Sequence, residues 1–374
     1  MSFEPTGRPA DLELAGPERS PAGRLRALLP WAILAPSRHN TQPWLFEIEG
    51  DELRLYADPS RALPATDPDG RELLMSCGAA LANVVVAAGH FGWATSVEIA
   101  PGHRRDGLVA RVQLEERRSI RPDVEELFQA IPRRRTNRLP LDGREPPEGL
   151  VAQLVREARR EGVAVRPVED HQRALVAELV SEGDRIQWSN PRWRAELASW
   201  THSSASPRRD GMPAAAQGLS DLAALLQPIL FRFRNPARIE AERDRRRART
   251  TRALLVFSTR RDGKEEWVAA GEALQRVLLR ATAAGLTASY LNQAIEVPEL
   301  RARLRDAIGE AGLPQIMIRL GYGLEAPPTP RRELEDVLRR YHPRARRTQS
   351  LALRGRLDLQ ALLGNGDFHA SGPG

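Results

Sequence analysis

The spacing of apolar and polar positions predicts alternating helices and strands along the chain. Trp31–Ala35 has the composition of a helix end, and the alternating side chains of Leu45–Ile48 predict a strand directly after it. A further helix is predicted over Val124–Ile131. The apolar residues at the start of Ile316–Gly323 predict a buried strand that ends in a glycine turn. This mixture of elements predicts an α+β fold.

Two of the predicted helical segments match each other in register. Seven positions between Gly78 and Ser96 recur between Gly271 and Ser289, each pair separated by 193 residues. Each segment has a small, aliphatic face and ends at a glycine suited to a left-handed C′ position. Shared helix composition would produce some of these matches, but seven in register favour a duplicated unit. The pairs are Gly78 with Gly271, Ala80 with Ala273, Leu81 with Leu274, Val84 with Val277, Ala88 with Ala281, Gly92 with Gly285, and Ser96 with Ser289.

Length and composition bound the class of protein. A chain of 374 residues is long enough for two domains. It has no run of about 18 apolar residues, so no transmembrane helix and no membrane partner are expected, and no secretory signal is expected because the N-terminus lacks an apolar core. The single cysteine, Cys77, excludes an intramolecular disulfide and is expected to be a buried, inert thiol. A cytoplasmic location is expected.

The net charge of +7 raises the question of a nucleic-acid partner. However, the 56 basic residues include one lysine, which indicates a compositional bias toward arginine, and 49 acidic residues are interleaved with them. Aromatic residues make up 5% of the chain, too few for a platform on which bases stack. The densest basic run, Arg243–Arg252, is expected to be a solvated helix face. No nucleic-acid partner is therefore expected.

Several common site motifs are absent from the sequence. No Gly-x-Gly-x-x-Gly fingerprint follows a strand, and the chain has neither a P-loop nor a Gly-x-Ser-x-Gly elbow. The seven histidines are scattered, and none forms a pair spaced for zinc, so no metal is expected.

The segment Ala35–Trp44 concentrates specialised side chains in one loop between a helix and a strand. Pro36 and Pro43 fix φ at either side of it. The two carboxamides, Asn40 and Gln42, each offer an acceptor and two donors, which suits the edge of a heterocycle. The other polar side chains between the prolines are those of Ser37, Arg38, His39 and Thr41. The loop is therefore a candidate ligand site.

A second candidate site is the run Arg133–Arg138, which follows the predicted helix at Val124–Ile131. The planar fork of arginine matches phosphate oxygens, and the hydroxyl of Thr136 adds a short neutral bond. The run therefore suits a phosphate monoester. The alternative is an ordinary basic turn in an arginine-rich chain.

The loop resembles the Pro-Ser-x-x-Asn-x-Gln-Pro-Trp loop of the FMN-dependent nitroreductase family. The run Arg134–Arg138 is similar to the family's Arg-x-Ser/Thr-x-Arg/Lys phosphate and ribityl site. Two further segments, Gly285–Gln293 and Ile316–Gly323, match its other flavin elements. The chain looks most like the long, Acg-like members, in which two nitroreductase-like units are fused, and the resemblance covers scattered blocks between residues 24 and 340.

The resemblance implies a nitroreductase-like α+β fold in which two sheet-and-helix units of one chain form a pseudo-dimer. The expected boundaries are residues 1–120 for the first unit and 121–345 for the second, followed by a tail at 346–374 that is extended or partly disordered beyond Leu363. A lid-like insertion is expected at about 190–252, with an apolar-rich run over Leu222–Phe233. His202 in this insertion is a candidate substrate contact, although an ordinary surface histidine is the preferred interpretation.

The resemblance also implies roles for individual residues. Arg134 and Thr136 would hold phosphate or ribityl oxygens of FMN, and Arg138 would approach the flavin near N1 and O2. Arg331 or Arg332 would close the phosphate site, with Arg332 preferred and a solvated helix start as the alternative. Backbone donors of Leu291 and Asn292 would reach N5 and O4, unless this segment is simply a core strand. The implied cofactor-binding set is Pro36, Ser37, Arg38, Asn40, Gln42, Arg134, Thr136, Arg138, Leu291, Asn292, Arg331 and Arg332.

The motifs occur once each, so one FMN site per chain is expected, with the second site of the pseudo-dimer degenerate. The resemblance predicts an oxidoreductase that passes a hydride from NADH or NADPH through FMN to a small-molecule acceptor such as a nitroarene or quinone. No side-chain nucleophile is expected, because the flavin carries the electrons. The alternative is an FMN-sequestering protein in which the insertion occludes the flavin. The chain is expected to be a monomeric pseudo-dimer or a homodimer.

Overall fold

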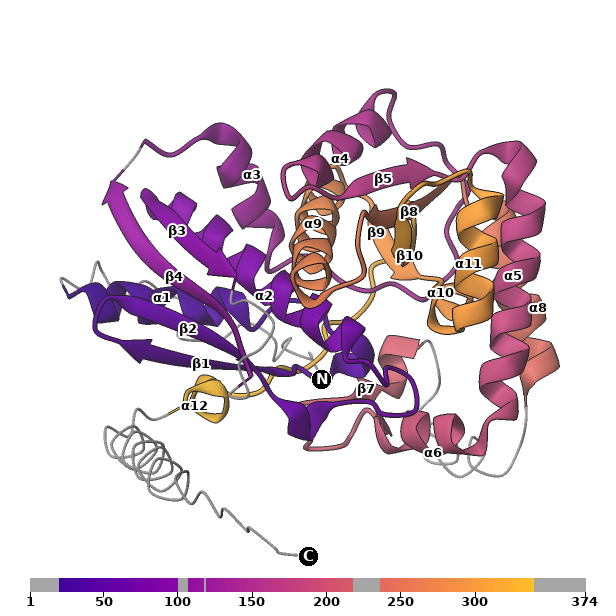
Figure 1. Ribbon diagram of the computed structural model, residues 1–374, viewed down its shortest axis with the longest axis horizontal. Helices are drawn as coiled ribbons and strands as arrows, with labels where there is room; N and C mark the ends of the chain where they lie inside the picture. The colour runs from indigo at the N-terminus through magenta and orange to yellow at the C-terminus, as the bar shows by residue number, and fades with distance from the viewer. Residues whose placement is uncertain (1–19, 100–106, 118, 218–235, 340–374) are drawn as a thin grey trace, which may run out of the picture. The chain divides into compact units, whose positions relative to one another are not determined.

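Two four-stranded antiparallel sheets organise the chain (Figure 1). The computed structural model describes residues 20–99, 107–117, 119–217 and 236–339. The first sheet has the order β1-β2-β4-β3 and the second the order β5-β8-β10-β9. The strands of the first sheet are β1 (Trp44–Glu49), β2 (Glu52–Ala57), β3 (Trp93–Ile99) and β4 (Leu108–Arg117). Those of the second are β5 (Ala164–Pro167), β8 (Ala253–Thr259), β9 (Thr287–Tyr290) and β10 (Leu313–Gly321).

The two sheets have the same topology. Replacing β1, β2, β4 and β3 by β5, β8, β10 and β9 converts one strand order into the other, with every pairing antiparallel. The predicted α+β class is confirmed, and the repeated topology supports the interpretation that two related units make up the chain. The boundaries proposed at residues 120 and 345 stay predictions.

Two long helices, α2 (Arg71–His90) and α9 (Lys264–Ala283), pack against each other between the sheets (Figure 1). A Cβ added to Gly78 would overlap the carbonyl oxygen of Val268, and one added to Gly271 would overlap that of Met75. Gly78 and Gly271 are 193 residues apart, and so are their contact partners Met75 and Val268. One contact is therefore the equivalent of the other, as expected where two equivalent helices cross on a two-fold axis. Each helix is followed by a glycine with positive φ, 81° at Gly92 and 79° at Gly285, as the sequence predicts.

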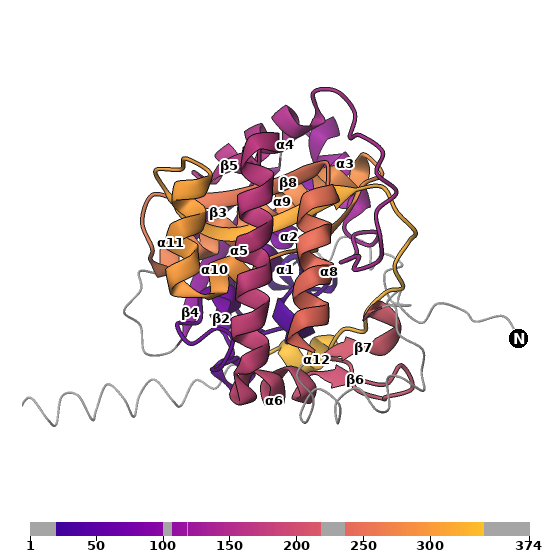
Figure 2. The same cartoon turned by 90° about the vertical axis from the view of Figure 1, so that its right-hand side faces the viewer.

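The second sheet is covered on both faces, which explains its continuous apolar strands. Every residue of β8 is buried. Leu255 and Phe257 face one core, which α9 and α4 (Leu150–Arg159) also line. Leu254 and Val256 face the opposite core. Four helices supply that second core: α5 (Asp170–Ser189), α8 (Ala237–Thr250), α10 (Gln293–Glu296) and α11 (Pro298–Ala307). Figure 2 shows α5 and α8 side by side.

The first sheet is covered mainly on one face. Its core contains Phe46 and Leu55 from the strands and residues of α1 (Pro21–Ala32), α2 and α3 (Pro122–Ala130). Along β1 the buried positions Trp44 and Phe46 alternate with half-buried ones, in agreement with the predicted strand. The helix predicted at Val124–Ile131 is α3, and the helix end predicted near Trp31 is the end of α1.

Among the described residues, α2 is the one helix long and apolar enough to cross a membrane. The most apolar part of α2 is 72% buried inside the protein. This burial is typical of the core helix of a soluble protein, which passes the same test of length and hydropathy. Cys77 on this helix is fully buried, as predicted, and burial raises the pKa of its thiol.

The region predicted as a lid-like insertion contains α6 (Pro191–Ser199), the two-residue strands β6 (Thr201–His202) and β7 (Met212–Pro213), the 3-10 helix η4 (Ala214–Gln217), and α8. Trp188 and Trp193 pack edge to face at 5.1 Å with Leu197 and Met212 around them. His202 is buried, with 9% of its surface exposed. The preferred interpretation of His202 as an ordinary surface histidine was therefore wrong. The predicted apolar run at Leu222–Phe233 and the tail beyond Leu363 lie outside the described residues.

Candidate functional site

The loop between α1 and β1 is held in a strained conformation. It contains the 3-10 helix η2 (Arg38–Asn40), and three non-glycine residues have positive φ: His39 at 50°, Asn40 at 56° and Gln42 at 52°. Such backbone conformations cost on the order of 1–3 kcal/mol each and persist where the surroundings over-determine them. The loop is therefore fixed, as the two prolines predict, and strain of this kind is concentrated at functional sites.

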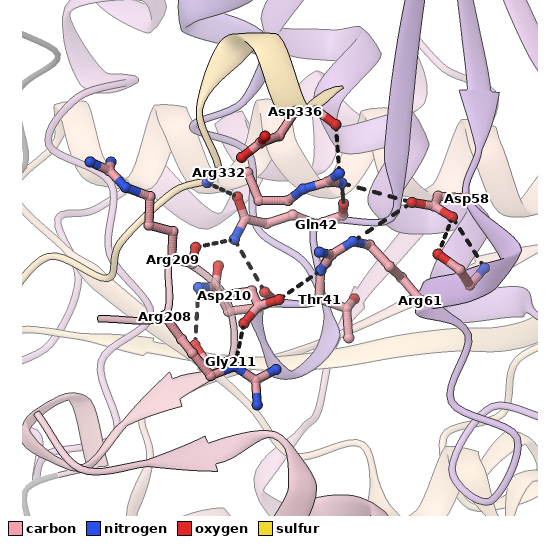
Figure 3. Close-up of polar contacts among 12 residues, drawn as sticks. Thr41, Gln42, Asp58, Arg61, Arg208, Arg209, Asp210, Gly211, Arg332 and Asp336 are labelled. Atoms are coloured by element: carbon pink, nitrogen blue, oxygen red, sulfur yellow. Dashed lines mark hydrogen bonds and ion pairs between the residues drawn. The ribbon is translucent and has the colours of Figure 1, made fainter. Parts of the chain in front are cut away.

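The carboxamides of this loop bind other parts of the chain. Asn40 Nδ2 donates to the carbonyls of Gly211 at 3.0 Å and Pro330 at 3.1 Å. Gln42 Nε2 donates to the Arg209 carbonyl at 2.8 Å, and Gln42 Oε1 accepts from the Arg332 amide at 2.8 Å. Both side chains thus hold the loop against the segments at 209–211 and 330–332. Figure 3 shows the contacts of Gln42.

An ion pair supports the same junction. Arg61, in the 3-10 helix η3 (Pro59–Arg61), lies 3.0 Å from Asp210 and also donates to the Thr41 carbonyl at 2.7 Å (Figure 3). The guanidiniums of Arg61 and Arg208 hold the pKa of Asp210 below its usual value despite partial burial. The segment at 208–211 is therefore fixed to the loop by both charge and amide contacts.

A cavity of about 430 Å³ opens beside the loop, within the range typical of small-molecule sites. It is lined by elements from both sheet units, with Met75 and Ala79 from α2, Leu274 from α9 and Ile316 from β10 as apolar wall. Of the predicted residues, Pro36, Ser37, Arg38, Thr136, Arg138, Leu291 and Asn292 line this cavity. Asn40, Gln42, Arg134, Arg331 and Arg332 do not line it.

Two buried guanidiniums lie beside the cavity without a carboxylate partner. Arg134 Nη2 and Arg331 Nη2 both point to the Leu34 carbonyl, at 3.5 and 3.3 Å. Arg134 Nε and Nη1 and Arg331 Nε are buried without a hydrogen-bond partner among the described residues, and no ion pair involves either residue there. Burial lowers the pKa of Arg134 to about 10 and that of Arg331, which Arg134 also repels, to about 9.

Arg331 and Arg332 point to different partners. The guanidinium of Arg332 donates to the carbonyls of Gln42 at 3.2 Å and Asp336 at 2.7 Å. Arg331 donates from Nη1 to Asn40 Oδ1 at 3.1 Å and to Thr329 Oγ1 at 2.7 Å. It also lies near Arg134 and Arg135, and burial and then repulsion from these two arginines lower its pKa. The structure therefore favours Arg331 over the preferred Arg332 as the residue at the basic cluster formed by Arg134, Arg135 and Arg331.

Thr136 and Arg138 connect this basic cluster to the cavity. Thr136 pairs with Ala288 of β9 in a parallel bridge, which brings the arginine run alongside the segment that contains Tyr290. Tyr290 is half-buried, lines the cavity and interacts with Thr136, and its partial burial raises its pKa. Arg138 lies 3.5 Å from the sulfur of Met212, and burial lowers its pKa to about 10. Tyr290 lies in the predicted segment Gly285–Gln293 but was not singled out as a site residue.

The segment at Leu291 and Asn292 is partly committed to the fold. The Leu291 amide donates to the Met317 carbonyl at 3.0 Å, which leaves it no free backbone donor for a ligand. The Asn292 side chain accepts from the Met317 amide at 2.9 Å and donates to Glu72 Oε1 at 3.4 Å. The predicted role of a backbone donor therefore does not fit Leu291.

The wall opposite the arginine run is rich in carboxyl groups that sequence reasoning missed. Arg38 Nη1 lies 2.8 Å from Glu296 Oε1, and Arg38 Nε lies 3.4 Å from Glu72 Oε2. Burial raises the pKa of Glu296 to about 8, although Arg38 opposes the shift. Asp184 from α5 and Asp244 from α8 complete this wall. The basic run predicted as a solvated face thus contributes Arg243, Asp244 and Arg247 to the cavity.

Sequence comparison decides the family. A relative from Mycobacterium tuberculosis named "Putative NAD(P)H nitroreductase" is 35% identical over 324 residues, which cover 85% of this chain and 91% of the relative. The chain belongs to the nitroreductase family. A second relative from the same organism, named "Putative NAD(P)H nitroreductase acg", is 30% identical over 86% of this chain and 96% of its own length. Membership of the predicted family, including its long Acg-like branch, is therefore confirmed.

Other comparisons of this family member add less. An "Uncharacterized protein" of Mycobacterium tuberculosis is 32% identical over 82% of this chain and 90% of its own length. The FMN and NADPH-dependent nitroreductase NfnB from "sphigopyxis sp. strain HMH" is 20% identical over 58% of this chain and 99% of its own, with a TM-score of 0.37. The FMN-dependent NfnB from Mycobacterium smegmatis, in complex with NADPH, is 16% identical over 59% and 98%, with a TM-score of 0.38. No protein-family model matches the chain.

Proposed function

We propose that this protein is an FMN-dependent oxidoreductase that transfers a hydride from NADH or NADPH to a nitroaromatic or quinone-like small molecule. Membership of a family whose members are named NAD(P)H nitroreductases supports the oxidoreductase class. The single observation that carries the cofactor is the pair of buried, carboxylate-free guanidiniums of Arg134 and Arg331.

The residues beside the cavity fit the phosphate of FMN. A buried cation with unsatisfied donors is costly unless an anion pairs with it, and arginine binds phosphate oxygens through its planar fork. Arg134 Nε and Nη1 and Arg331 Nε supply three such donors. A phosphate dianion would satisfy them and raise the lowered pKa of both side chains.

The remaining residues orient the cofactor and shape its surroundings. FMN, when bound, supplies two-electron hydride chemistry between the nicotinamide and the acceptor. The Thr136 hydroxyl lies between the basic cluster and Tyr290, where it can hold a phosphate or ribityl oxygen. Arg138 provides a cation at the cavity wall, and Met75 and Leu274 provide an apolar surface that excludes water.

One complete site per chain follows from the origin of the lining residues. Ser37 and Met75 come from the first sheet unit, and Thr136 and Tyr290 come from the second. A single polypeptide therefore supplies both sides of the cavity, and we propose that the site needs no second subunit, whether or not the chain pairs further.

Anaerobic absorption spectroscopy tests the proposal. The purified full-length protein is loaded with FMN, titrated with NADPH and then with NADH, and finally mixed with a benzoquinone or a nitroarene. Bleaching of the flavin band by either nicotinamide and its return on addition of the acceptor are expected. A protein that refuses FMN, or bound FMN that neither nicotinamide bleaches, contradicts the reductase.

A second candidate function, sequestration of FMN without turnover, is favoured by one observation. The segment at 208–211 is fixed to the site loop by the Arg61–Asp210 ion pair and by Gln42 (Figure 3), and by Asn40 as well. A segment held closed in this way would restrict access of the nicotinamide to bound FMN.

Weakening that junction distinguishes the two functions. Asp210→Asn removes the ion pair with Arg61 while leaving the amide contacts of Asn40 in place. If the closed segment prevents turnover, the variant should bleach at least about tenfold faster with NADPH than the parent, since opening would then limit the rate. Equal rates in both proteins, with FMN bound, argue against sequestration by this segment.

A further inference from the structure

Asp184 and Asp244 form a carboxyl pair in the cavity wall, on two helices that pack side by side (Figure 2). One amide nitrogen, Gln293 Nε2, donates to Asp244 Oδ2 at 2.6 Å and to Asp184 Oδ1 at 3.3 Å. The two side chains are buried, with 3% of Asp184 and 8% of Asp244 exposed. The shared amide therefore holds two carboxyl groups close together in a site with little water.

The two members of the pair have different surroundings. Asp244 Oδ1 accepts from Arg247 Nη1 at 2.7 Å, so this carboxylate is neutralised by an ion pair. Asp184 Oδ2 is buried without a hydrogen-bond partner in the described part of the chain, and no ion pair involves Asp184 there. Because two neighbouring carboxylates cannot both ionise easily, and because Arg247 and, at 4.0 Å, Arg243 both pair with Asp244, Asp184 is the member that keeps a proton.

The charged groups around Asp184 agree with this assignment. Burial and, next to it, the Asp244 carboxylate raise the pKa of Asp184 to about 8, and Gln293 and Arg243 oppose the shift. From α10, Glu296 also raises the pKa, and Glu296 is itself paired with Arg38. The cations on α6 and α11 contact other residues of α5: Arg194 binds the Trp188 carbonyl and Arg303 binds Glu182.

We propose that Asp184 is the general acid of this enzyme, donating a proton from the cavity wall to the oxygen of the acceptor as the hydride arrives. The inference rests on the proposed function, in which the acceptor occupies the same cavity as the cofactor. It assigns a catalytic residue that no sequence motif indicates, and it limits acceptors to molecules with a reducible, proton-accepting oxygen, such as quinones and nitroarenes.

The step balances for both acceptor classes. A quinone takes one hydride, which originates from NAD(P)H and brings two electrons, and one proton from the Asp184 carboxyl; the O–H bond of Asp184 breaks and an O–H bond forms on the acceptor. A nitroarene takes the same hydride and proton and leaves as a nitroso compound and water. Solvent protons then return Asp184 to its neutral form.

Infrared spectroscopy of the full-length protein tests the proton without turnover. A protonated carboxyl shows a C=O band that shifts in D₂O, and the wild-type minus Asp184→Asn difference spectrum isolates the band of Asp184. This band should be present at about pH 6 and vanish as the pH rises through about 8. Asp244→Asn, which removes the neighbouring negative charge, should move its loss to lower pH. Absence of the band at about pH 6 overturns the proposal.

Kinetics then separate the proton step from the function on which it rests. In Asp184→Asn the rate of NADPH bleaching of bound FMN should stay within about twofold of wild type, whereas the rate of reoxidation by benzoquinone should fall about 100-fold, the usual contribution of a general acid. The wild-type reoxidation rate should decline above about pH 8, and this decline should be absent in the variant. Asp184→Glu should recover part of the rate.

A control variant and separate readouts distinguish failure of the general acid from failure of the proposed function. Glu178→Gln changes an exposed carboxyl of the same helix that is paired with Arg245, and it should behave as wild type in every assay. If FMN does not bind or does not bleach, the proposed function fails while the infrared result still stands. If FMN bleaches and Asp184→Asn reoxidises at the wild-type rate, the general acid is overturned. A higher KM for cationic acceptors alone, with kcat unchanged, would show a binding role for Asp184 instead and also overturn it.

Discussion

The carboxyl pair lines the cavity and the basic cluster lies beside it, and each leaves a different kind of group unsatisfied. Arg134 and Arg331 turn toward a shared carbonyl and have no carboxylate among the described residues to neutralise them. Asp184 and Asp244 share one amide, and the ion pairs with Arg247 and Arg243 both go to Asp244. A buried unpaired charge is costly, so each region needs a partner that the fold does not supply. A phosphate can compensate the first region, and a proton compensates the second.

The two regions also respond differently to a ligand. The guanidiniums of the basic cluster stay charged near neutral pH, because the lowered pKa values of Arg134 and Arg331 remain at about 10 and about 9. Their compensation must therefore come from a bound anion. The Asp184 carboxyl, with a pKa of about 8, can change its protonation state near neutral pH and needs no bound anion or cation.

Removing both buried guanidiniums is expected to have the largest effect, on the affinity for FMN. Arg134→Ala with Arg331→Ala should weaken FMN binding by about 10²–10⁴-fold, since each charge-assisted contact is worth about 1.5–3 kcal/mol. Arg134→Ala alone should cost about 1.5–3 kcal/mol of cofactor binding. Isothermal titration with FMN and with riboflavin, which lacks the phosphate, measures the effect; the loss should be large for FMN and small for riboflavin.

Two neighbouring arginines serve as controls for this experiment. Arg133 is exposed and donates to the Gln129 carbonyl, and Arg133→Ala should leave FMN affinity unchanged. Arg332→Ala should have a smaller effect than Arg331→Ala, because Arg332 holds Gln42 and Asp336 instead of joining the basic cluster. Equal losses in Arg331→Ala and Arg332→Ala would contradict the assignment of Arg331.

The basic cluster could be predicted from the sequence in part because its chemistry is contiguous. The run that contains Arg134, Thr136 and Arg138 and the loop that contains Ser37 each place several specialised residues within a few positions. The choice between Arg331 and Arg332 could not be predicted, because adjacent residues of an irregular segment point to different partners. The amides of Asn40 and Gln42 could not be assigned either, since their partners are backbone groups far along the chain.

No motif in the sequence predicted the carboxyl pair. Asp184 and Asp244 are 60 residues apart, and only the packing of α5 against α8 brings them together. Asp244 lies in an arginine-rich run whose composition is typical of a solvated helix, and this composition hid its contribution to the cavity. The topology was easier to predict, because the glycines at 78 and 271 and those at 92 and 285 mark the same positions of two equivalent helices.

The carboxyl pair should make the stability of the protein depend on pH. Between the unfolded pKa of Asp184, near 3.8, and its folded value of about 8, the folded protein keeps a proton that the unfolded chain has lost. Raising the pH through this window therefore lowers the free energy of unfolding, by about 1.4 kcal/mol for each pH unit inside the window, and the decline ends above about pH 8. Asp184→Asn should reduce this decline, and Glu296, with a similar raised pKa, should account for part of what remains.

Urea denaturation of the FMN-free protein at about pH 5, 7 and 9 measures this dependence. Glu178→Gln, on the solvent-exposed side of the same helix, should show the wild-type dependence. A variant Asp184→Asn whose stability falls as steeply as that of wild type would mean that Asp184 is ionised in the folded protein across this range.

The smallest expected effect concerns the stability of the basic cluster without its ligand. Arg134→Met replaces a buried, uncompensated guanidinium by an apolar chain of similar length, so the FMN-free variant should be about 1 kcal/mol more stable than wild type by urea denaturation. The increase in Tm that FMN causes in wild type should shrink in the variant.

Arg276 is a matched control for Arg134, because it is also buried but is paired with Glu157 at 2.6 Å. Arg276→Met leaves that carboxylate buried and unpaired, so it should destabilise the protein by about 3 kcal/mol and leave the FMN-induced increase in Tm unchanged. Opposite signs for the two variants mean that Arg134 is held for a ligand, at the expense of the stability of the empty protein. If Arg134→Met destabilises the FMN-free protein as much as Arg276→Met does, then Arg134 stabilises the fold itself and the phosphate is not its partner.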